Sequence, residues 1–292
     1  MITVRIKGGL GNQLFQYAVG YALSKEINQE LVFNPSFTSN MTPRGYKLSN
    51  LGVQYSNIAD DTDLPLKIRV LKNKYVNKAC RIVRGGEIYR YKNGIYFLEK
   101  NESFQAGIFK LSSKDIYLDG YFQSEKYFKR YRKELLRQII PSYEKESEYI
   151  EVLDQVKIDC SVAIHVRRGD FKKDNSSYHY LLREKYYRNA LDLIEEHVER
   201  PTFFWFSDDI DWVKKNFGEK DNYRFVSLHT SHADIDEMMV MKNCHHIITA
   251  NSTFSWWSAW LNEYEDAIRI CPAKQYGNKD MIPESWIKVE ME

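Results

Sequence analysis

Two adjacent arginines in the segment HVRRGD, residues 165–170, have the chemistry to hold a diphosphate. A guanidinium stays charged at every physiological pH and offers paired N–H donors that fit two phosphate oxygens. Arg167 and Arg168 could therefore balance the negative charge that grows on a leaving phosphate without a metal ion. The alternative is a surface ion pair between Arg168 and Asp170, and these residues alone do not decide between the two interpretations.

A second polar cluster, Ser207-Asp208-Asp209, directly follows an apolar run. Paired carboxylates can bind a divalent metal, accept hydrogen bonds from a guanine or a ribose, or cap the helix that follows them. Aspartate near a helix start is also stabilised by the helix dipole. From the residue types alone, capping is the favoured single role of Asp208 and Asp209.

A third cluster of small polar residues precedes Trp256 and Trp257 and comprises Asn251, Ser252, Thr253, Phe254 and Ser255. Hydroxyl side chains at a helix start, together with its free backbone N–H groups, form a favourable site for an anion. The alternative is an ordinary N-cap whose two tryptophans belong to the core. Its position after a predicted strand favours the anion site.

A glycine-rich turn, KGGLGNQ at residues 7–13, allows a ligand to approach the backbone of Gly9, Gly11 and Asn12 closely. It is not the dinucleotide fingerprint, because Leu14 occupies the place of the third glycine. It also lacks the Gly-Lys-Ser/Thr ending of a nucleotide-binding P-loop. NAD and P-loop ATP chemistry are therefore disfavoured.

The elements that must position these clusters alternate between strands and helices along most of the chain. The patterns predict strands at 3–6, 31–33, 117–121, 161–166, 202–206, 224–228, 246–249 and 268–270, and helices at 13–27, 64–84, 125–140, 184–198, 211–217, 233–242 and 254–261. Such alternation is typical of parallel sheets, in which ligands bind beyond the carboxyl ends of the strands. Because each polar cluster follows a strand, the clusters at 165–170, 207–209 and 251–255 should meet at one edge.

Composition narrows the class of protein further. The 292 residues carry 42 Lys and Arg against 40 Asp and Glu, a formal charge of +2, so no nucleic-acid partner is expected. The four cysteines, at positions 80, 160, 244 and 271, lack the spacing of a zinc site. Two of them lie in apolar runs, which favours reduced thiols and a reducing compartment. No run of 18 apolar residues occurs, so a cytoplasmic location is expected.

The predicted helix at 64–84 has an apolar face and a basic face. Such a helix can rest on anionic lipid, which would make the protein peripheral at the inner face of a membrane. The alternative, a solvated face of a helix that packs on the sheet, is favoured about two to one from the general frequency of such helices.

Taken together, GGLGNQ, HVRRGD, SDD and NSTFSWW, in this order and over nearly the whole chain, resemble the α-1,2-fucosyltransferases of glycosyltransferase family 11, bacterial type. The resemblance implies an α/β fold of the GT-B type, with two Rossmann-like domains whose mostly parallel sheets face a cleft. The expected domains are 1–155, which would bind the acceptor, and 156–292, which would bind GDP-fucose. It also implies that no metal or other cofactor is needed.

The resemblance further implies inverting transfer of L-fucose from GDP-fucose to the 2-hydroxyl of a terminal galactose. The acceptor would be a surface oligosaccharide or O-antigen precursor, and it could be lipid-linked. Arg167, helped by Arg168 and the turn at 252–255, would stabilise the leaving GDP. Asp170 is the first candidate for the base and His165 the second. The alternatives are an inactive sugar-binding module and a transferase of another sugar nucleotide.

The remaining site residues have less specific expected roles. The absence of a metal leaves Asp208 and Asp209 for the nucleotide or for structure. Gly9, Gly11 and Asn12 are expected to approach the donor or the acceptor. Phe171, the aromatic after HVRRGD, is a mild departure from the family pattern.

Overall fold

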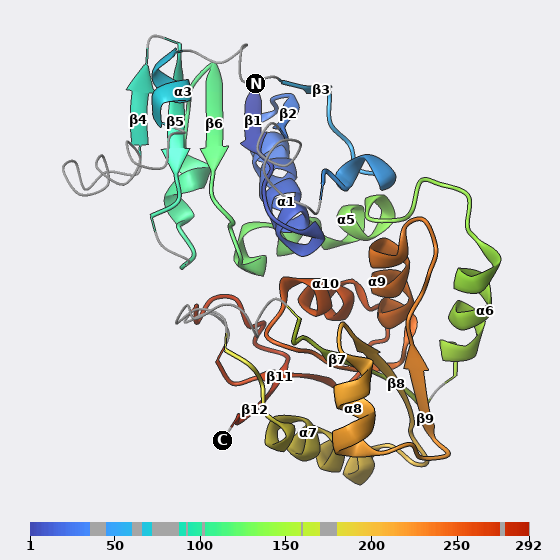
Figure 1. Cartoon of the computed structure of the whole chain (residues 1–292). Helices are drawn as coiled ribbons and strands as arrows, with labels where there is room; N and C mark the ends of the chain where they lie inside the picture. Colours follow the sequence, from blue (N-terminus) through green and yellow to red (C-terminus); the bar gives the residue numbers. More distant parts are fainter. Residues whose placement is uncertain are drawn as a thin grey trace. The chain divides into compact units, whose positions relative to one another are not determined.

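The computed structural model describes residues 1–35, 45–59, 66–71, 88–91, 93–100, 103–158, 160–169, 180–274 and 278–291. The chain divides into two compact units, Met1–Ser142 and Tyr143–Glu292, and each contains a six-stranded, mostly parallel sheet with helices (Figure 1). The α/β fold with two Rossmann-like units is thereby confirmed. The boundary expected after residue 155 lies instead after Ser142, because helix α6 (Ser147–Val156) packs against helix α9 (Ala233–Asn243) within the second unit.

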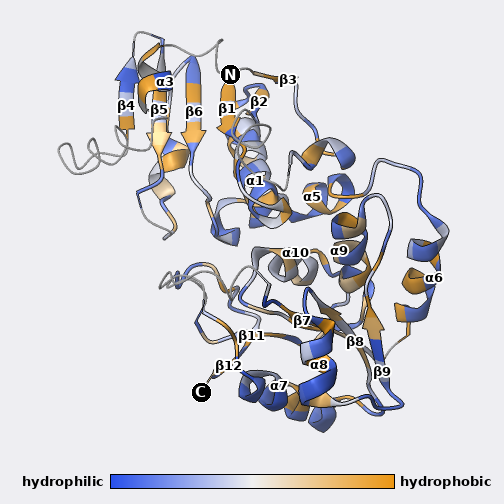
Figure 2. Cartoon of the chain, viewed as in Figure 1, coloured by the Kyte–Doolittle hydropathy of each residue, from blue (hydrophilic) through white to orange (hydrophobic). Residues whose placement is uncertain are grey.

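The first unit is built around the strand order β3-β2-β1-β6-β5-β4. Every pairing is parallel except that of β4 with β5. Its elements are β1 (Ile2–Arg5), α1 (Leu10–Ile27), β2 (Leu31–Asn34), η1 (Leu48–Asn50), β3 (Asn57–Ile58), α3 (Leu66–Leu71), β4 (Ile88–Tyr91), β5 (Gly94–Leu98), η3 (Ala106–Lys110), β6 (Asp115–Asp119), η4 (Glu125–Tyr127), η5 (Lys129–Tyr131) and α5 (Arg132–Gln138). Figure 2 shows much of β1, β5 and β6 in the colours of hydrophobic residues, as buried strands require.

Two predictions for the first unit are wrong in their bounds. The continuous helix expected at 125–140 is divided into η4, η5 and α5, because Phe128 leaves the helical conformation with φ −141° and ψ −1°. Its buried ring packs on Phe15, with 5.9 Å between the ring centroids. The strand expected at 117–121 ends at Asp119, which places Gly120 and Tyr121 beyond the carboxyl end of β6.

The second unit is a fully parallel sheet with the order β12-β11-β10-β7-β8-β9. Its remaining elements are β7 (Ser161–Val166), α7 (Glu184–His197), β8 (Thr202–Ser207), α8 (Ile210–Phe217), β9 (Tyr223–Val226), β10 (His246–Ile248), α10 (Thr253–Leu261), β11 (Arg269–Pro272) and β12 (Ile287–Val289). Counted from β7, this is the doubly wound order 3-2-1-4-5-6 of dinucleotide-binding folds. The strand order reverses between β7 and β10, and ligands bind at that switch point.

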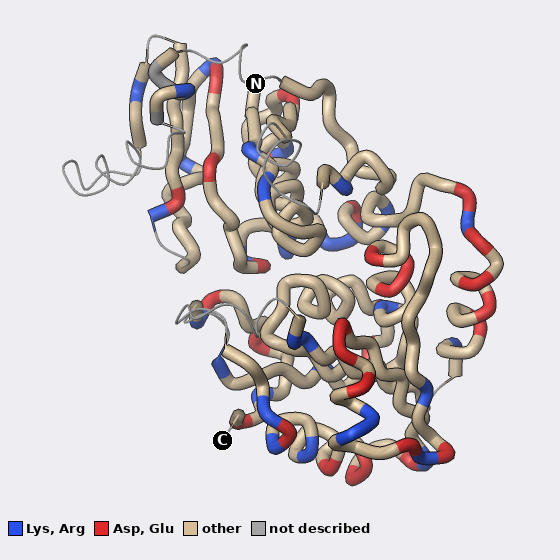
Figure 3. The backbone as a smooth tube through the Cα atoms, viewed as in Figure 1, with Lys and Arg blue, Asp and Glu red and all other residues tan. Residues whose placement is uncertain are grey.

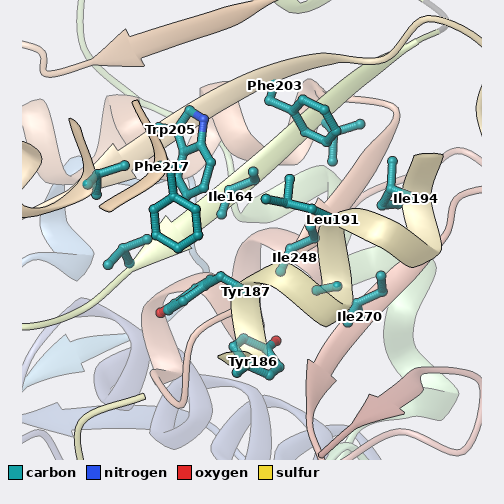
Figure 4. Packing of buried hydrophobic residues seen from close by; sticks show 14 of the residues in the cluster. Ile164, Tyr186, Tyr187, Leu191, Ile194, Phe203, Trp205, Phe217, Ile248 and Ile270 are labelled. Carbon is teal, nitrogen blue, oxygen red and sulfur yellow. The ribbon is translucent and has the colours of Figure 1, made fainter. Parts of the chain in front are cut away.

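Aromatic side chains fix helix α7 against this sheet. Tyr186 and Tyr187 are fully buried beside Ile164 and Ile248 of the central strands (Figure 4). Trp205 of β8 packs on Phe217 of α8, with 4.9 Å between the ring centroids. Burial of such rings contributes about 2 kcal/mol or more each, so the strands that carry the polar clusters are held firmly.

Three further expectations concern the chain outside the sheets. Of the helix expected at 64–84, the structure describes α3 at Leu66–Leu71, and the rest lies outside the described residues. Within the described ranges, no helix is long and apolar enough to span a membrane. Cys160, Cys244 and Cys271 are free thiols, as predicted for two of them, whereas Cys80 lies outside the described residues.

Candidate active site

The two arginines meet the two aspartates at the carboxyl edge of the second sheet. Strands β7 and β8 are parallel neighbours whose last residues, Val166 and Ser207, are paired, so the residues that follow stand side by side. Arg167 Nη1 lies 2.8 Å from Asp208 Oδ2, and Arg168 Nε lies 3.3 Å from Asp209 Oδ2. The Arg168 backbone N–H also donates to Asp208 Oδ1 at 2.8 Å. The predicted convergence of these two clusters is confirmed. Figure 3 shows the Arg/Lys and Asp/Glu stretches that follow β7 and β8.

Arg168 is fixed more tightly than Arg167. Its guanidinium carbon lies 3.8 Å from the centroid of the Trp212 ring, and its side chain is 14% exposed against 26% for Arg167. Asp209 caps α8, because its Oδ1 accepts the Trp212 N–H at 3.4 Å. The favoured capping role is thus confirmed for Asp209 and not for Asp208. Arg167 is the arginine more available to a ligand.

Gly169 allows this close arrangement. A Cβ atom at position 169 would lie 2.8 Å from Asp208 Oδ2 and 3.2 Å from its carboxyl carbon. A larger residue at this position would force the Asp208 carboxylate to shift. Asp170 follows immediately but lies outside the described residues, so its expected role as base stays a prediction.

His165 joins the arginine turn to the start of helix α10. Its Nδ1 shares a 2.9 Å hydrogen bond with Ser255 Oγ, which also accepts the Ala250 N–H at 3.2 Å. The ring lies 5.4 Å from that of Phe254 and is 5% exposed. Burial, helped by the positive charge of Arg167, lowers the pKa of His165 to about 3. The imidazole is therefore neutral at pH 7 and a weak proton acceptor.

The third cluster fits both of its interpretations. Ser252 caps α10, since its Oγ accepts the Phe254 N–H at 3.3 Å, and Trp256 and Trp257 are fully buried. The same helix start, with Thr253 as its first residue, stands at the switch point between β7 and β10. The dipole of a helix favours a phosphate at its start, so the anion site stays a prediction. Asn251 supports the turn by donating to the Tyr180 carbonyl at 2.7 Å.

The glycine-rich turn belongs to the first unit, whereas the other predicted site residues that the structure describes belong to the second. Gly8 has φ +81°, and a Cβ there would lie 2.7 Å from Asn12 Nδ2. The Asn12 Oδ1 accepts a hydrogen bond from the Gln123 amide at 2.9 Å. Gly9 precedes α1 as its N-cap residue, so this turn forms part of the carboxyl edge of the first sheet beside β1.

Two acidic residues at these edges, the half-buried Glu237 and the fully buried Asp119, were not predicted. Glu237 of α9 accepts the Leu228 N–H at 3.1 Å, and burial raises the pKa of its carboxyl group to about 7. It was missed because it lies in a Met-rich helix whose pattern indicates core packing. Asp119 ends β6 and is fully buried between Arg5 and Lys7, at 2.7 and 2.8 Å. It was missed because it lies inside a predicted strand.

The fold and the arginine-lined switch point define a GT-B-like glycosyltransferase. The chain belongs to the family described as glycosyl transferase family 11, whose model matches residues 1–290. An Escherichia coli alpha-1,2-colitosyltransferase is 30% identical and covers 99% of both chains. The Escherichia coli O-antigen biosynthesis glycosyltransferase WbnK is 29% identical, over 97% of this chain and 99% of its own. A galactoside 2-alpha-L-fucosyltransferase from Caenorhabditis elegans is 26% identical, over all of this chain and 79% of its own.

Solved structures support the same fold at low sequence identity. POFUT1 in complex with GDP superimposes with a TM-score of 0.53 and 13% identity, over 92% of this chain and 96% of its own. Arabidopsis thaliana FUT1 in complex with GDP gives 0.51 and 12% identity, over all of this chain and 74% of its own. These similarities establish the GT-B-like fold of a family 11, fucosyltransferase-like glycosyltransferase.

Proposed function

We propose that this protein transfers L-fucose from GDP-fucose to the 2-hydroxyl of a terminal galactose, with inversion at the anomeric carbon and without a metal ion. The observation that carries the proposal is the arginine turn at the switch point of the second sheet. There Arg167 stands beside Asp208 at 2.8 Å, and the nearby helix α10 begins at Thr253. A cationic turn and a helix N-terminus together suit the diphosphate of a sugar nucleotide.

The second unit would hold the donor. Arg167, the more exposed arginine, would leave its contact with Asp208 and take the phosphate next to the sugar. Arg168, stacked on Trp212 and paired with Asp209, would keep the turn in place.

His165 would orient Ser255 and the helix start through their 2.9 Å hydrogen bond. The half-buried carboxyl of Glu237 lies in the helix after β9, where it suits N–H or hydroxyl donors of the nucleoside.

The chemical step would be a single displacement. The acceptor 2-oxygen forms a bond to the anomeric carbon while the bond from that carbon to the phosphate oxygen breaks, and GDP leaves with its electron pair. The hydroxyl proton passes to a base. Asp170 is the proposed base, because the His165 ring is buried and its Nδ1 is already hydrogen-bonded to Ser255. The two arginines stabilise the charge on GDP, so the step is proposed to need no metal.

The names of two relatives support the proposed acceptor and pathway. One is named a galactoside 2-alpha-L-fucosyltransferase and another an O-antigen biosynthesis glycosyltransferase, which agree with a galactose acceptor and a role in surface polysaccharide synthesis. A lipid-linked acceptor belongs to the same proposal, whereas a solvated face stays the favoured interpretation of the segment 64–84. Location in the cytoplasm also remains a proposal.

GDP-colitose is the alternative donor, because the relative that is 30% identical is named a colitosyltransferase. Colitose is L-fucose without its 3-hydroxyl, so the two donors differ by one polar group. A site built to bind that hydroxyl rejects the deoxy sugar strongly, whereas a site without such a contact accepts both. GDP-fucose is proposed as the preferred donor, and the comparison of both donors decides.

The test measures GDP release from GDP-fucose, GDP-colitose and GDP-mannose, each with and without lactose, in the presence of EDTA. The proposal predicts acceptor-dependent GDP release that is fastest with GDP-fucose. Faster release with GDP-colitose would reassign the donor. Binding of GDP without release from any donor would indicate the inactive sugar-binding module, and activity that returns only with added Mg²⁺ or Mn²⁺ would refute the metal-free step.

A further inference from the structure

Tyr121 is unusual among the aromatic residues of this chain. The sequence contains 21 Tyr, 15 Phe and 6 Trp, and among those that the structure describes only Tyr121 is exposed, at 40%. Its neighbours Asp119 and Phe122 are fully buried. The exposed ring leaves an aromatic face available to a ligand between buried neighbours.

The backbone that carries Tyr121 is held in place by hydrogen bonds to Glu99. The Glu99 carboxylate accepts the Tyr121 N–H at 2.6 Å through Oε2 and the Phe122 N–H at 3.0 Å through Oε1. Phe122 has φ +53°, a left-handed conformation that a phenylalanine rarely adopts. A Cβ at Gly120 would lie 2.5 Å from the Cβ of Glu99, so only glycine fits. Strained backbone that its surroundings hold in this way is frequent at ligand sites.

The ring itself is also held in place. The Lys7 ammonium lies 4.7 Å from the centroid of the Tyr121 ring and 2.8 Å from Asp119 Oδ1. Asp119 is fixed in turn by Arg5 and by the Tyr96 hydroxyl, both at 2.7 Å. The contact with this fixed lysine limits the motion of the Tyr121 ring, so less side-chain freedom is lost on binding.

The position of Tyr121 is that of a ligand site. Strands β1 and β6 are parallel neighbours, so the residues after β6 and the glycine-rich turn after β1 share one edge of the sheet. Gln123 joins the two segments by its 2.9 Å hydrogen bond to Asn12. Ligands of parallel sheets bind at this edge. One face of a galactose ring carries the hydrogens of C3, C4 and C5 and packs well on the face of an aromatic ring.

We infer that the terminal galactose of the acceptor stacks on the Tyr121 ring, on the face that Lys7 does not cover. The inference deepens the proposed function and rests on it. It assigns the acceptor sugar to the first unit by contacts that involve neither the arginine turn nor the helix start that the donor would use. Loss of the ring should therefore weaken acceptor binding and leave donor binding intact.

The experiment compares wild-type protein with Tyr121→Ala, Tyr121→Phe and Tyr121→Trp, and with Ile150→Ala, which removes a similarly exposed apolar side chain on α6. Fucose transfer to lactose gives the acceptor KM and kcat, and titration calorimetry gives the Kd of GDP. We expect Tyr121→Ala to raise the acceptor KM by about tenfold or more, while the Kd of GDP stays unchanged. Tyr121→Phe and Tyr121→Trp should recover most of the acceptor affinity, and Ile150→Ala should match the wild type.

An unchanged acceptor KM in Tyr121→Ala, with active wild-type protein, would overturn this inference and leave the proposed function standing. Equal loss of GDP affinity in that variant would also overturn it, since the ring would then serve the donor or the fold. If the wild-type protein transfers fucose to no galactoside, the proposed function itself fails.

Discussion

The Arg167 guanidinium contacts the Asp208 carboxylate at 2.8 Å, with both side chains 26% exposed. The pair stands beyond the carboxyl ends of β7 and β8, where the diphosphate is proposed to bind. A pair this accessible to water is worth about 1 kcal/mol or less. A doubly charged diphosphate can therefore displace Asp208 from Arg167 at little cost, so the pair keeps the arginine in place without blocking the site.

Replacing Arg167 with Lys tests whether the geometry of the guanidinium matters. Lysine keeps the charge but loses the paired donors, so we expect kcat to fall about 10²- to 10³-fold. The matched control is Arg188→Lys on α7, where the arginine pairs with Glu184 on the surface, and it should retain full activity. Normal turnover of Arg167→Lys would show that a point charge is sufficient.

Replacing Asp208 with Asn removes the carboxylate that competes with phosphate for Arg167. We expect the Kd of GDP to fall up to about fivefold, the equivalent of about 1 kcal/mol. We also expect kcat to decrease, because no carboxylate then positions the Arg167 guanidinium. Asp154→Asn, which removes a surface partner of Lys157, serves as the control. A large rise in the Kd of GDP, measured by calorimetry, would mean that Asp208 binds the nucleotide directly.

Gly169→Ala should disturb the same pair through sterics alone. The added Cβ would lie 2.8 Å from Asp208 Oδ2, so the carboxylate must move and the arginine turn with it. We expect at least about a tenfold loss of kcat/KM with little change in the free energy of unfolding, because the displaced atoms belong to a partly exposed side chain. Gly107→Ala is the matched control, since a Cβ there meets no described atom within 4 Å. If both variants behave alike, the close contact at Gly169 has no functional consequence.

The buried His165 makes the stability depend on pH. Its pKa is about 3 in the folded protein and about 6.5 when unfolded, so only the unfolded state binds a proton between these values. The contribution of the neutral His165 to the free energy of unfolding is fully present above pH 6.5 and is lost as the pH falls toward 3. When the pH falls from 7 to 5, the free energy of unfolding measured in urea should decrease by about 2 kcal/mol less in His165→Asn than in the wild type. The exposed His197→Asn should follow the wild type, and an equal loss in all three proteins would contradict the assigned pKa.

Much of the second unit was predictable because its strands are short apolar runs between amphipathic helices. The strand at Ser161–Val166 matches its prediction residue for residue. The pattern also placed three polar clusters at one edge, but it could not show which side chains pair there. Arg168 contacts Asp209 and Trp212, which the sequence did not indicate as its partners, and its expected pairing with Asp170 lies outside the described residues. Such pairings depend on the register of β7 and β8, which a single sequence does not specify.

The first unit was less predictable for a physical reason. The spacing at 125–140 fits a helix throughout, but the buried ring of Phe128 draws the chain out of the helical conformation. Tyr121 likewise continues an alternating strand pattern, although the strand ends at Asp119. Tertiary contacts, here those of Phe15 and Glu99, overrode local preference in both places.

The most direct test of the central claim is the structure of the product formed from GDP-fucose and lactose in the presence of EDTA, determined by NMR. We expect an α-linked L-fucose on the 2-oxygen of the galactose, because a single displacement inverts the β-linked donor. A product with retained configuration, a linkage to another hydroxyl, or no transfer of fucose in EDTA would contradict it.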